Sequence, residues 1–228
     1  MKRKLLCIPL IAWAAMFAVS LLLFLFPGTD LAVSALFYTP GEGFLQHSTL
    51  WERFFYRSVP VVLTGFYVGA LLLWVYNRAA RRSLLAFDGR KLLYVLLVGA
   101  LGSGLLVNAV LKDHWGRARP VQTVPFGGEK AFTAPFVLSD QGGKSFSSGH
   151  TSGAFALLAL VFLARRGRAA VAAGVIAYGA AVSLARIAAG GHFFSDVIVS
   201  VFIMYIVSAV LYDRMFGCAA EKKEHNGV

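Results

Sequence analysis

The stretch LLYVLLVGALGSGLLVNAVL, Leu92 to Leu111, is followed at once by KDHWGRARP, Lys112 to Pro120. The first part carries no charged side chain over 20 residues, which is the length of an α-helix that crosses a hydrocarbon core about 30 Å thick. The second part adds a lysine and two arginines directly after that helix. The junction predicts a membrane-spanning helix that ends in an anion-binding segment.

The rest of the chain has the same apolar character. Of the 228 residues, 58% are hydrophobic, which exceeds the roughly 45–50% of soluble domains, and the mean hydropathy is +0.69. Six apolar runs have about the length of a membrane span: Leu5–Phe26, Val59–Tyr76, Leu92–Leu111, Ser152–Ala164, Ala169–Ala185 and Val197–Tyr212. We therefore expect an all-α fold, a polytopic six-transmembrane-helix bundle with external active-site loops.

One such bundle uses nearly the whole chain, which leaves no room for a second domain. We expect residues 1–228 to form a single membrane-embedded domain whose core motifs lie at 112–196. The tail at 219–228 is short, polar and charged, so we expect it to be disordered.

Lysines and arginines are unevenly distributed between the connections of these helices. Of 22 such residues, 14 lie in the N-terminal segment, the second and fourth connections and the C-terminal tail. The positive-inside rule then predicts that both termini are cytoplasmic and that the odd-numbered connections are external. These topology signals account for the net charge of +11. No basic groove with interleaved aromatic residues is present in the sequence, so we expect no nucleic-acid partner.

Three short clusters carry side chains suited to a phosphoryl group: KDHWGRARP (112–120), SSGH (147–150) and RIAAGGHFFSD (186–196). No predicted membrane-spanning helix lies between the first two clusters, and two such helices lie between the second and the third. All three clusters are therefore expected on the external side. Phosphoryl transfer requires mainly positioning and fixed positive charge. The clusters combine cations, a hydroxyl, backbone amides, two histidines and a carboxylate, and together they predict a phosphatase.

The candidate residues form two sets. Those expected to bind phosphate oxygens are Lys112, Arg119, Ser148, Gly149 and Arg186. Those expected to be catalytic are His150, His192 and Asp196. Taken alone, each has a simpler explanation, because a basic residue at a helix end is commonly an interfacial anchor and a serine before a helix is commonly its N-cap. Only the joint pattern favours a catalytic site.

The third cluster suggests a nucleophile with an orienting group. If the last helix begins near Gly191, His192 and Asp196 are four residues apart on one helical face. Asp196 would then accept a proton from one imidazole nitrogen and leave the other free to attack phosphorus. His150, after the SSGH turn, would give a proton to the leaving group.

The first external connection contains aromatic residues at nearly helical spacing, between Phe44 and Phe55. This pattern is typical of an interfacial helix that lies at the headgroup level and guides a lipid substrate. A plain connector whose aromatic side chains anchor the bundle fits the same pattern equally well.

At its three clusters the chain resembles the type-2 phosphatidic acid phosphatases, a superfamily that includes the vanadium haloperoxidases. The family signatures K-x6-RP, PSGH and SR-x5-H-x3-D correspond to Lys112 with Arg119-Pro120, to Ser148-Gly149-His150, and to Arg186 with His192 and Asp196. Two positions depart from the signatures: Ser147 replaces the proline, and Ala185 replaces the serine before the arginine. Neither departure removes a catalytic role.

The resemblance implies a lipid phosphatase of six transmembrane helices that needs no metal and no cofactor. It implies that His192 forms a phosphohistidine, that Asp196 is its partner, and that His150 protonates the leaving group. FGGEKAF (126–132) and KSFSSGH (144–150) are most similar to bacterial lipid A phosphatases. We therefore expect a multi-pass protein of the bacterial inner membrane, with a membrane lipid phosphate as substrate and the active site on the periplasmic face.

Other functions fit parts of the pattern. An undecaprenyl diphosphate or phosphatidylglycerophosphate phosphatase would carry the same signatures, and so would a lipid-to-lipid phosphotransferase. A haloperoxidase is disfavoured because those enzymes are soluble. A transporter would need polar residues along its helices, where Asn108 and scattered serines and threonines are almost the only ones. The sequence carries no signal for an oligomeric state.

Overall fold

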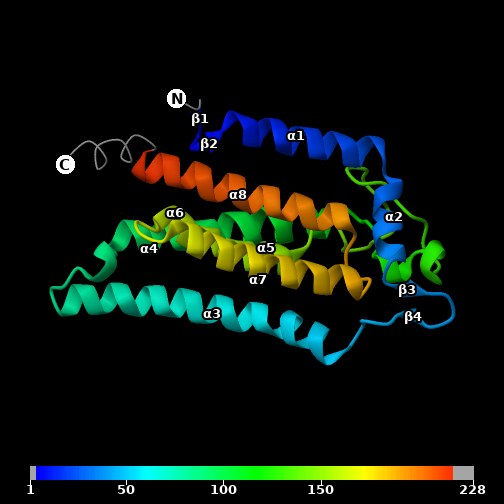
Figure 1. Cartoon of the computed structure of the whole chain (residues 1–228), viewed down its shortest axis with the longest axis horizontal. Coiled ribbons are helices and arrows are strands. Elements are labelled where there is room, and N and C mark those ends of the chain that lie inside the picture. The colour runs from blue at the N-terminus through cyan, green and yellow to red at the C-terminus, as the bar shows by residue number, and fades with distance from the viewer. Residues whose placement is uncertain (1–3, 218–228) are drawn as a thin grey trace.

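The computed structural model describes residues 4–217 and shows a bundle of antiparallel helices (Figure 1). Its elements, in chain order, are β1 (Lys4–Leu5), β2 (Ile8–Pro9), α1 (Leu10–Leu25), α2 (Gly28–Ala35), β3 (Tyr38–Thr39), β4 (Gly43–Phe44), α3 (Leu50–Ala79), η1 (Leu84–Ala86), α4 (Gly89–Leu97), η2 (Val98–Lys112), η3 (Pro120–Gln122), η4 (Val124–Phe126), α5 (Gly149–Ala156), α6 (Leu158–Leu163), α7 (Arg168–Ala188) and α8 (Phe194–Phe216). In the described part of the chain, the named strands form two ladders, β1 with β2 and β3 with β4. The predicted all-α class is confirmed.

Several of these helices are long and apolar enough to cross a membrane. Four of them qualify alone: α3, the continuous helix of α4 and η2, α7 and α8. A fifth span results if α1 and α2, which meet at 86°, are counted together. The helical segment Gly149–Leu163, made of α5 and α6, is apolar but shorter. Residues 4–217 thus form a polytopic helical fold with four or five spans by length and composition, and the predicted count of six is not confirmed.

The N-terminal part of the chain differs from the expectation at both ends of its first helix. The helix was expected from Leu5, but α1 begins at Leu10 because Lys4–Pro9 forms the antiparallel ladder of β1 and β2. It ends at Leu25, two residues before Pro27, where the chain bends by 86° into α2. The expected tail at 219–228 lies outside the described residues.

Between Phe44 and Phe55, where an interfacial helix was one of two interpretations, the structure has no separate helix. Phe44 lies in β4, and the aromatic residues from Trp51 onward belong to the first turns of α3. α3 begins here because the Thr49 side chain caps it, accepting the Glu52 backbone N–H at 3.3 Å. This early start brings the outer end of α3 next to the phosphate clusters.

The short helix α5 lies within the bundle, packed against η2, α7 and α8 (Figure 1). Close approach depends on small residues: a side chain at Gly102 in η2 would lie 2.7 Å from the Met204 sulfur in α8. η2 has π-helical geometry, and the Asn108 side chain donates to the Ser103 carbonyl at 2.7 Å within it. The wider turn rotates the last residue, Lys112, relative to an α-helix of the same length.

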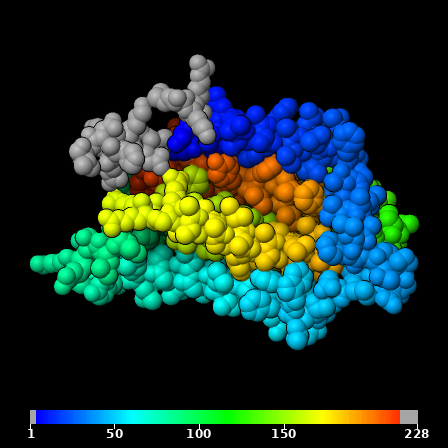
Figure 2. All heavy atoms as spheres, in the orientation of Figure 1, coloured from blue at the N-terminus to red at the C-terminus, as the bar shows by residue number. Residues whose placement is uncertain are grey.

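Loops and α2 cover the end of the bundle that holds Lys112 and His192, which we call the outer end. Figure 2 shows α2 and the segment after it closing this end. Three aromatic side chains, Phe44, Phe126 and Phe193, form a small core there that joins β4, η4 and the start of α8. This core holds the segment between α2 and α3 against the loop that precedes α8.

Candidate active site

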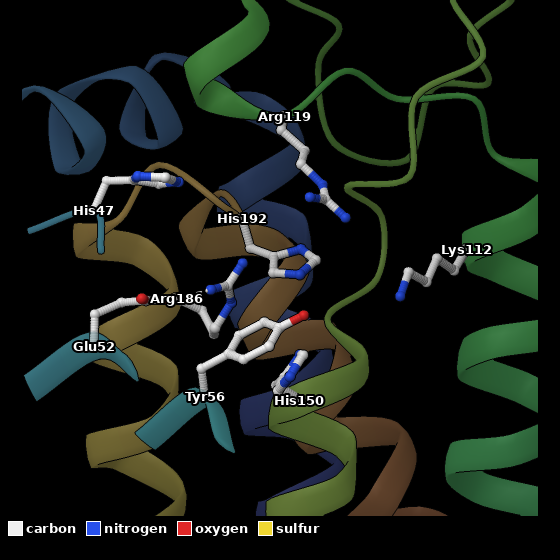
Figure 3. A pocket seen from close by; sticks show the side chains of 8 residues that line it. All are labelled: His47, Glu52, Tyr56, Lys112, Arg119, His150, Arg186 and His192. Carbon is white, nitrogen blue, oxygen red and sulfur yellow. Dashed lines mark hydrogen bonds and ion pairs between the residues drawn. The ribbon is translucent and has the colours of Figure 1, made fainter. Parts of the chain in front are cut away.

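A cavity of about 310 Å³ opens at the outer end of the bundle. Its lining residues, labelled in Figure 3, are His47, Glu52, Tyr56, Lys112, Arg119, His150, Arg186 and His192. Five of the eight candidate site residues are in this lining, and they come from all three sequence clusters. The expected convergence of the clusters on one end of the bundle is therefore present.

Three positively charged side chains project toward this cavity from different elements. Lys112 ends η2, Arg119 precedes η3, and Arg186 lies in the last turn of α7. The Val121 N–H donates to the Gly190 carbonyl at 3.2 Å, which joins the loop of the first cluster to that of the third. Fixed cations on several sides suit the oxygens of a phosphoryl group.

Arg186 has the most enclosed environment of the three. Its Nη1 donates to Glu52 Oε1 at 2.6 Å, and both side chains are 9% exposed. Its guanidinium lies 4.9 Å from the centre of the Tyr56 ring. Its Nε is buried and has no hydrogen-bond partner among residues 4–217. Glu52 and Tyr56 of α3 thus hold Arg186 at the wall of the cavity.

His150 lies in the first turn of α5, at its outer end. The Tyr56 ring lies against the imidazole with ring centres 4.1 Å apart and planes inclined by 32°. Burial, followed by the charges of Arg186, Lys112 and Arg119, lowers the pKa of His150 to about 4. At pH 7, and without an anion beside it, His150 is therefore neutral.

His192 lies in the loop between α7 and α8 and is 2% exposed. Its Nδ1 is 2.7 Å from the Ser145 carbonyl oxygen, which can only accept, so Nδ1 carries the proton and Nε2 has a free lone pair. Figure 3 shows the ring in the cavity, close to Arg119 and Arg186. Burial and then these two cations lower the pKa of His192 well below its usual value. A neutral imidazole with a free Nε2 is chemically suited to attack phosphorus.

The expected placement of His192 and Asp196 on one helical face is wrong. α8 begins at Phe194, so His192 precedes the helix. The nearest atoms, His192 Nδ1 and Asp196 Oδ2, are 3.9 Å apart, beyond hydrogen-bond distance. Asp196 Oδ2 instead accepts the Ser145 hydroxyl at 2.6 Å and the Phe193 backbone N–H at 2.8 Å. Asp196 is therefore linked to His192 through Ser145, whose carbonyl is the direct acceptor, and its catalytic role stays a prediction.

Ser148 and Gly149 are not among the residues that line the cavity. The Ser148 hydroxyl accepts the Thr151 backbone N–H at 3.4 Å, so Ser148 is the N-cap of α5. A side chain at Gly149 would lie 2.7 Å from Asn108 Oδ1 and 3.5 Å from Lys112 Nζ. The glycine thus permits α5 to approach η2 closely, and the phosphate-binding roles of these two residues stay predictions.

Sequence reasoning missed three lining residues, His47, Glu52 and Tyr56, all in or just before α3. The Thr49-x-x-Glu52 spacing is a helix-start pattern and could have placed the beginning of α3. It carries no information about the partner of Glu52, which is Arg186, 134 residues later.

The amino-acid sequence was also compared with known protein families and structures. The family model described as the PAP2 superfamily matches residues 93–218, which include all three clusters. No solved structure matches the chain.

Curated relatives match most of the chain. A lipid A 4'-phosphatase of Francisella tularensis subsp. novicida (strain U112) is 35% identical over 214 residues, covering 88% of this chain and 90% of the relative. A lipid A 4'-phosphatase of Rhizobium leguminosarum is 31% identical over 202 residues, covering 82% and 87%. One from Rhizobium etli is also 31% identical, covering 82% of this chain and 79% of the relative.

Proposed function

The chain belongs to the PAP2 superfamily, and on this premise we propose that it hydrolyses the 4'-phosphate monoester of lipid A. It is a phosphoric monoester hydrolase that acts on a lipid phosphate. The choice of lipid A is supported by relatives that carry this activity in their names and match 82–88% of the chain. Undecaprenyl diphosphate and phosphatidylglycerophosphate are the competing substrates.

One structural observation supports the proposed reaction type. The cavity places cations from η2, the following loop and α7 around two neutral histidines. Lys112, Arg119 and Arg186 would bind the phosphate oxygens and stabilise the charge that develops on them. His192 and His150 would supply the nucleophile and the acid.

In the first chemical step, His192 Nε2 attacks the phosphorus. A P–N bond forms while the P–O bond to the sugar breaks, and the leaving oxygen takes a proton from His150, which is protonated once the phosphate is bound beside it. The Nδ1 proton stays in its hydrogen bond to the Ser145 carbonyl, which keeps the imidazole in the reactive tautomer. The product of this step is a phosphohistidine and a dephosphorylated lipid.

In the second step, water hydrolyses the phosphohistidine. His150, now neutral, removes a proton from the water as its oxygen attacks phosphorus. The P–N bond breaks, inorganic phosphate forms, and His192 regains its lone pair. His150 carries the proton needed for the next cycle, so protons balance over the two steps.

The position of the cavity suits a substrate whose phosphate lies at the membrane surface. It opens at the outer end of apolar helices, whereas the basic residues Arg78, Arg90 and Arg168 lie at the opposite ends of α3, α4 and α7. By the positive-inside rule this arrangement favours a periplasmic active site and cytoplasmic termini in a bacterial inner membrane.

The test is phosphate release by the purified protein in detergent, with EDTA present. Within residues 4–217 no group of three or more histidine, cysteine, aspartate or glutamate side chains is arranged to hold a metal ion, and EDTA tests the expected metal independence. Lipid A, undecaprenyl diphosphate, phosphatidylglycerophosphate and phosphatidic acid are compared. His192→Ala is expected to abolish release, whereas His114→Ala, an exposed histidine outside the lining, is expected to keep it.

Preference for another lipid would contradict the lipid A proposal but keep the phosphatase. Release that survives His192→Ala would contradict the nucleophile assignment. Transfer of phosphate to an added acceptor lipid in place of water would identify a phosphotransferase.

A further inference from the structure

We propose that Arg117 and Asp30 are positioning residues that hold His192 in its reactive orientation. Neither residue lines the cavity, and their side chains are 0% and 1% exposed. They form a buried charge network with Asp196, which is linked to the nucleophile through Ser145. The proposal rests on the proposed function, in which His192 is the attacking group.

The Arg117 guanidinium makes directional contacts on every side. Its Nη1 donates to Asp196 Oδ1 at 2.6 Å and to the Ser195 hydroxyl at 2.9 Å. Its Nη2 donates to Asp30 Oδ2 at 2.7 Å, and its Nε donates to the Thr133 carbonyl at 2.9 Å. A planar fork held at three nitrogens has a single orientation.

Asp30 joins this network to the N-terminus of α8. Its Oδ1 accepts the Ser195 backbone N–H at 2.8 Å, and its Oδ2 accepts the Ser195 hydroxyl at 2.5 Å. A carboxylate at this place is favoured by the partial positive charge of the helix N-terminus. Asp30 lies in α2, and the 86° bend between α1 and α2 brings that helix to the outer end of the bundle (Figures 1 and 2).

The network reaches His192 through two hydrogen bonds. Asp196, fixed by Arg117, accepts the Ser145 hydroxyl at 2.6 Å, and the Ser145 carbonyl accepts from His192 Nδ1 at 2.7 Å. The Arg117 backbone takes part as well, because its carbonyl accepts the Ser145 N–H at 3.0 Å. The Arg117 guanidinium also lies 4.3 Å from the ring centre of Phe193, the neighbour of His192. Both the carbonyl that orients the imidazole and the backbone beside it therefore depend on Arg117.

A buried cluster of one guanidinium and two carboxylates is a poor means of stabilising a fold. Removing three charges from water costs several kcal/mol for each ion, and well-packed apolar side chains are often at least as stabilising. What the cluster provides that apolar packing does not is a fixed direction for each hydrogen bond. Direction is what an imidazole needs when its Nε2 must point at phosphorus.

The test is Asp30→Asn, with kcat expressed per active site. The amide keeps the size of the carboxylate and an acceptor for the Ser195 N–H, but it cannot accept from both Arg117 and the Ser195 hydroxyl. Misorienting the nucleophile is expected to lower kcat by about 10- to 100-fold. KM for the lipid is expected to stay within about twofold, because the cations that bind phosphate do not contact Asp30.

Active sites are counted by calorimetric titration with sulfate, a stable dianion that should bind the same cations. A merely structural role would reduce the number of sulfate sites and leave kcat per site unchanged. Asp113→Asn is the matched control, because this carboxylate pairs with Lys144 at 2.8 Å but is 50% exposed and outside the network. The control is expected to retain wild-type kcat and KM.

An unchanged kcat per site in Asp30→Asn would overturn the proposal, and so would an equal fall in Asp113→Asn. If Asp30→Asn yields no folded protein, Ser195→Ala replaces it, since this variant removes only the hydroxyl between Asp30 and Arg117. A lower kcat per site in Ser195→Ala supports the proposal, and an unchanged value overturns it. Failure of the proposed function would give a different result from failure of this proposal, because the wild-type protein itself would then release no phosphate.

Discussion

His150 is expected to gain a proton when a phosphate enters the cavity. Without an anion, burial and the surrounding cations hold the pKa of His150 at about 4, so the imidazole is neutral at pH 7. The proposed acid role requires the protonated form. Substrate binding must therefore raise the pKa of His150 by about 3 units, which corresponds to about 4 kcal/mol.

The charge of a phosphate monoester is sufficient for this shift. One negative charge about 4 Å from the imidazole contributes about 4 kcal/mol at an effective dielectric constant of about 20. A phosphate monoester carries a charge of about −1.5 to −2 at pH 7. The pKa of His150 in the complex is therefore expected above 7.

The sign of the linkage follows from these two values. Because the free imidazole has a pKa of about 4 and the complex a pKa above 7, anion binding takes up a proton at pH 6.5. Uptake decreases below about pH 4, where the free form is already protonated, and again above the pKa of the complex.

The assay is calorimetric titration with sulfate at pH 6.5 in two buffers of different ionisation enthalpy. Sulfate does not titrate in this range, so the difference between buffers counts the protons taken up by the protein. About one proton per site is expected for the wild type and for His114→Ala, and almost none for His150→Ala. Full uptake in His150→Ala would refute the reasoning, because His192 would then be the group that is protonated.

The same variant has a kinetic signature. His150→Ala should lower turnover of the lipid phosphate by about 10²- to 10⁴-fold, the usual contribution of a general acid. It should affect p-nitrophenyl phosphate far less, because p-nitrophenolate leaves without a proton. Equal losses on both substrates would contradict the acid role.

Two further predictions concern the charges that line the cavity. Glu52→Gln removes a negative charge but keeps an acceptor for Arg186. The inhibition constant of inorganic phosphate should therefore fall on the order of tenfold. A higher inhibition constant would contradict this prediction and would mean that the carboxylate mainly holds Arg186 in place. Lys112→Ala should lower kcat/KM by about 10- to 100-fold, the value of one charge-assisted hydrogen bond. Lys144→Ala, which replaces an exposed lysine in the loop between η4 and α5, is the control and should change kcat/KM less than about twofold.

The helices could be predicted from the sequence because their signal is local. The apolar run at Leu92–Leu111 became the helix of α4 and η2, and the run at Ala169–Ala185 became α7, each within a few residues of its expected bounds. The ends were less predictable, because caps and prolines decide them. Pro9 and Pro27 limit α1, and Thr49 begins α3 well before the expected Val59.

The candidate site could be predicted in part for the same reason. The sequence predicts an even number of membrane crossings between successive clusters, which was enough to predict that all three lie at one end of the bundle. In the structure, one cavity is lined by Lys112, Arg119, His150, Arg186 and His192. The relation of His192 to Asp196 was not predictable, because it depended on where α8 begins. A shift of that start from Gly191 to Phe194 takes His192 off the helical face.

The sequence by itself determined the membrane-spanning character, the order of the helices and the identity of the cationic and imidazole groups at the outer end. Each of these follows from residue type and spacing along the chain. The tertiary structure alone decided the partners of those groups: Glu52 with Arg186, Asp30 with Arg117, and the Ser145 carbonyl with His192. The first two join residues 134 and 87 positions apart, and the third uses a backbone oxygen that every residue type possesses. Such contacts leave no pattern in a single sequence, because they depend on how the helices and loops pack together.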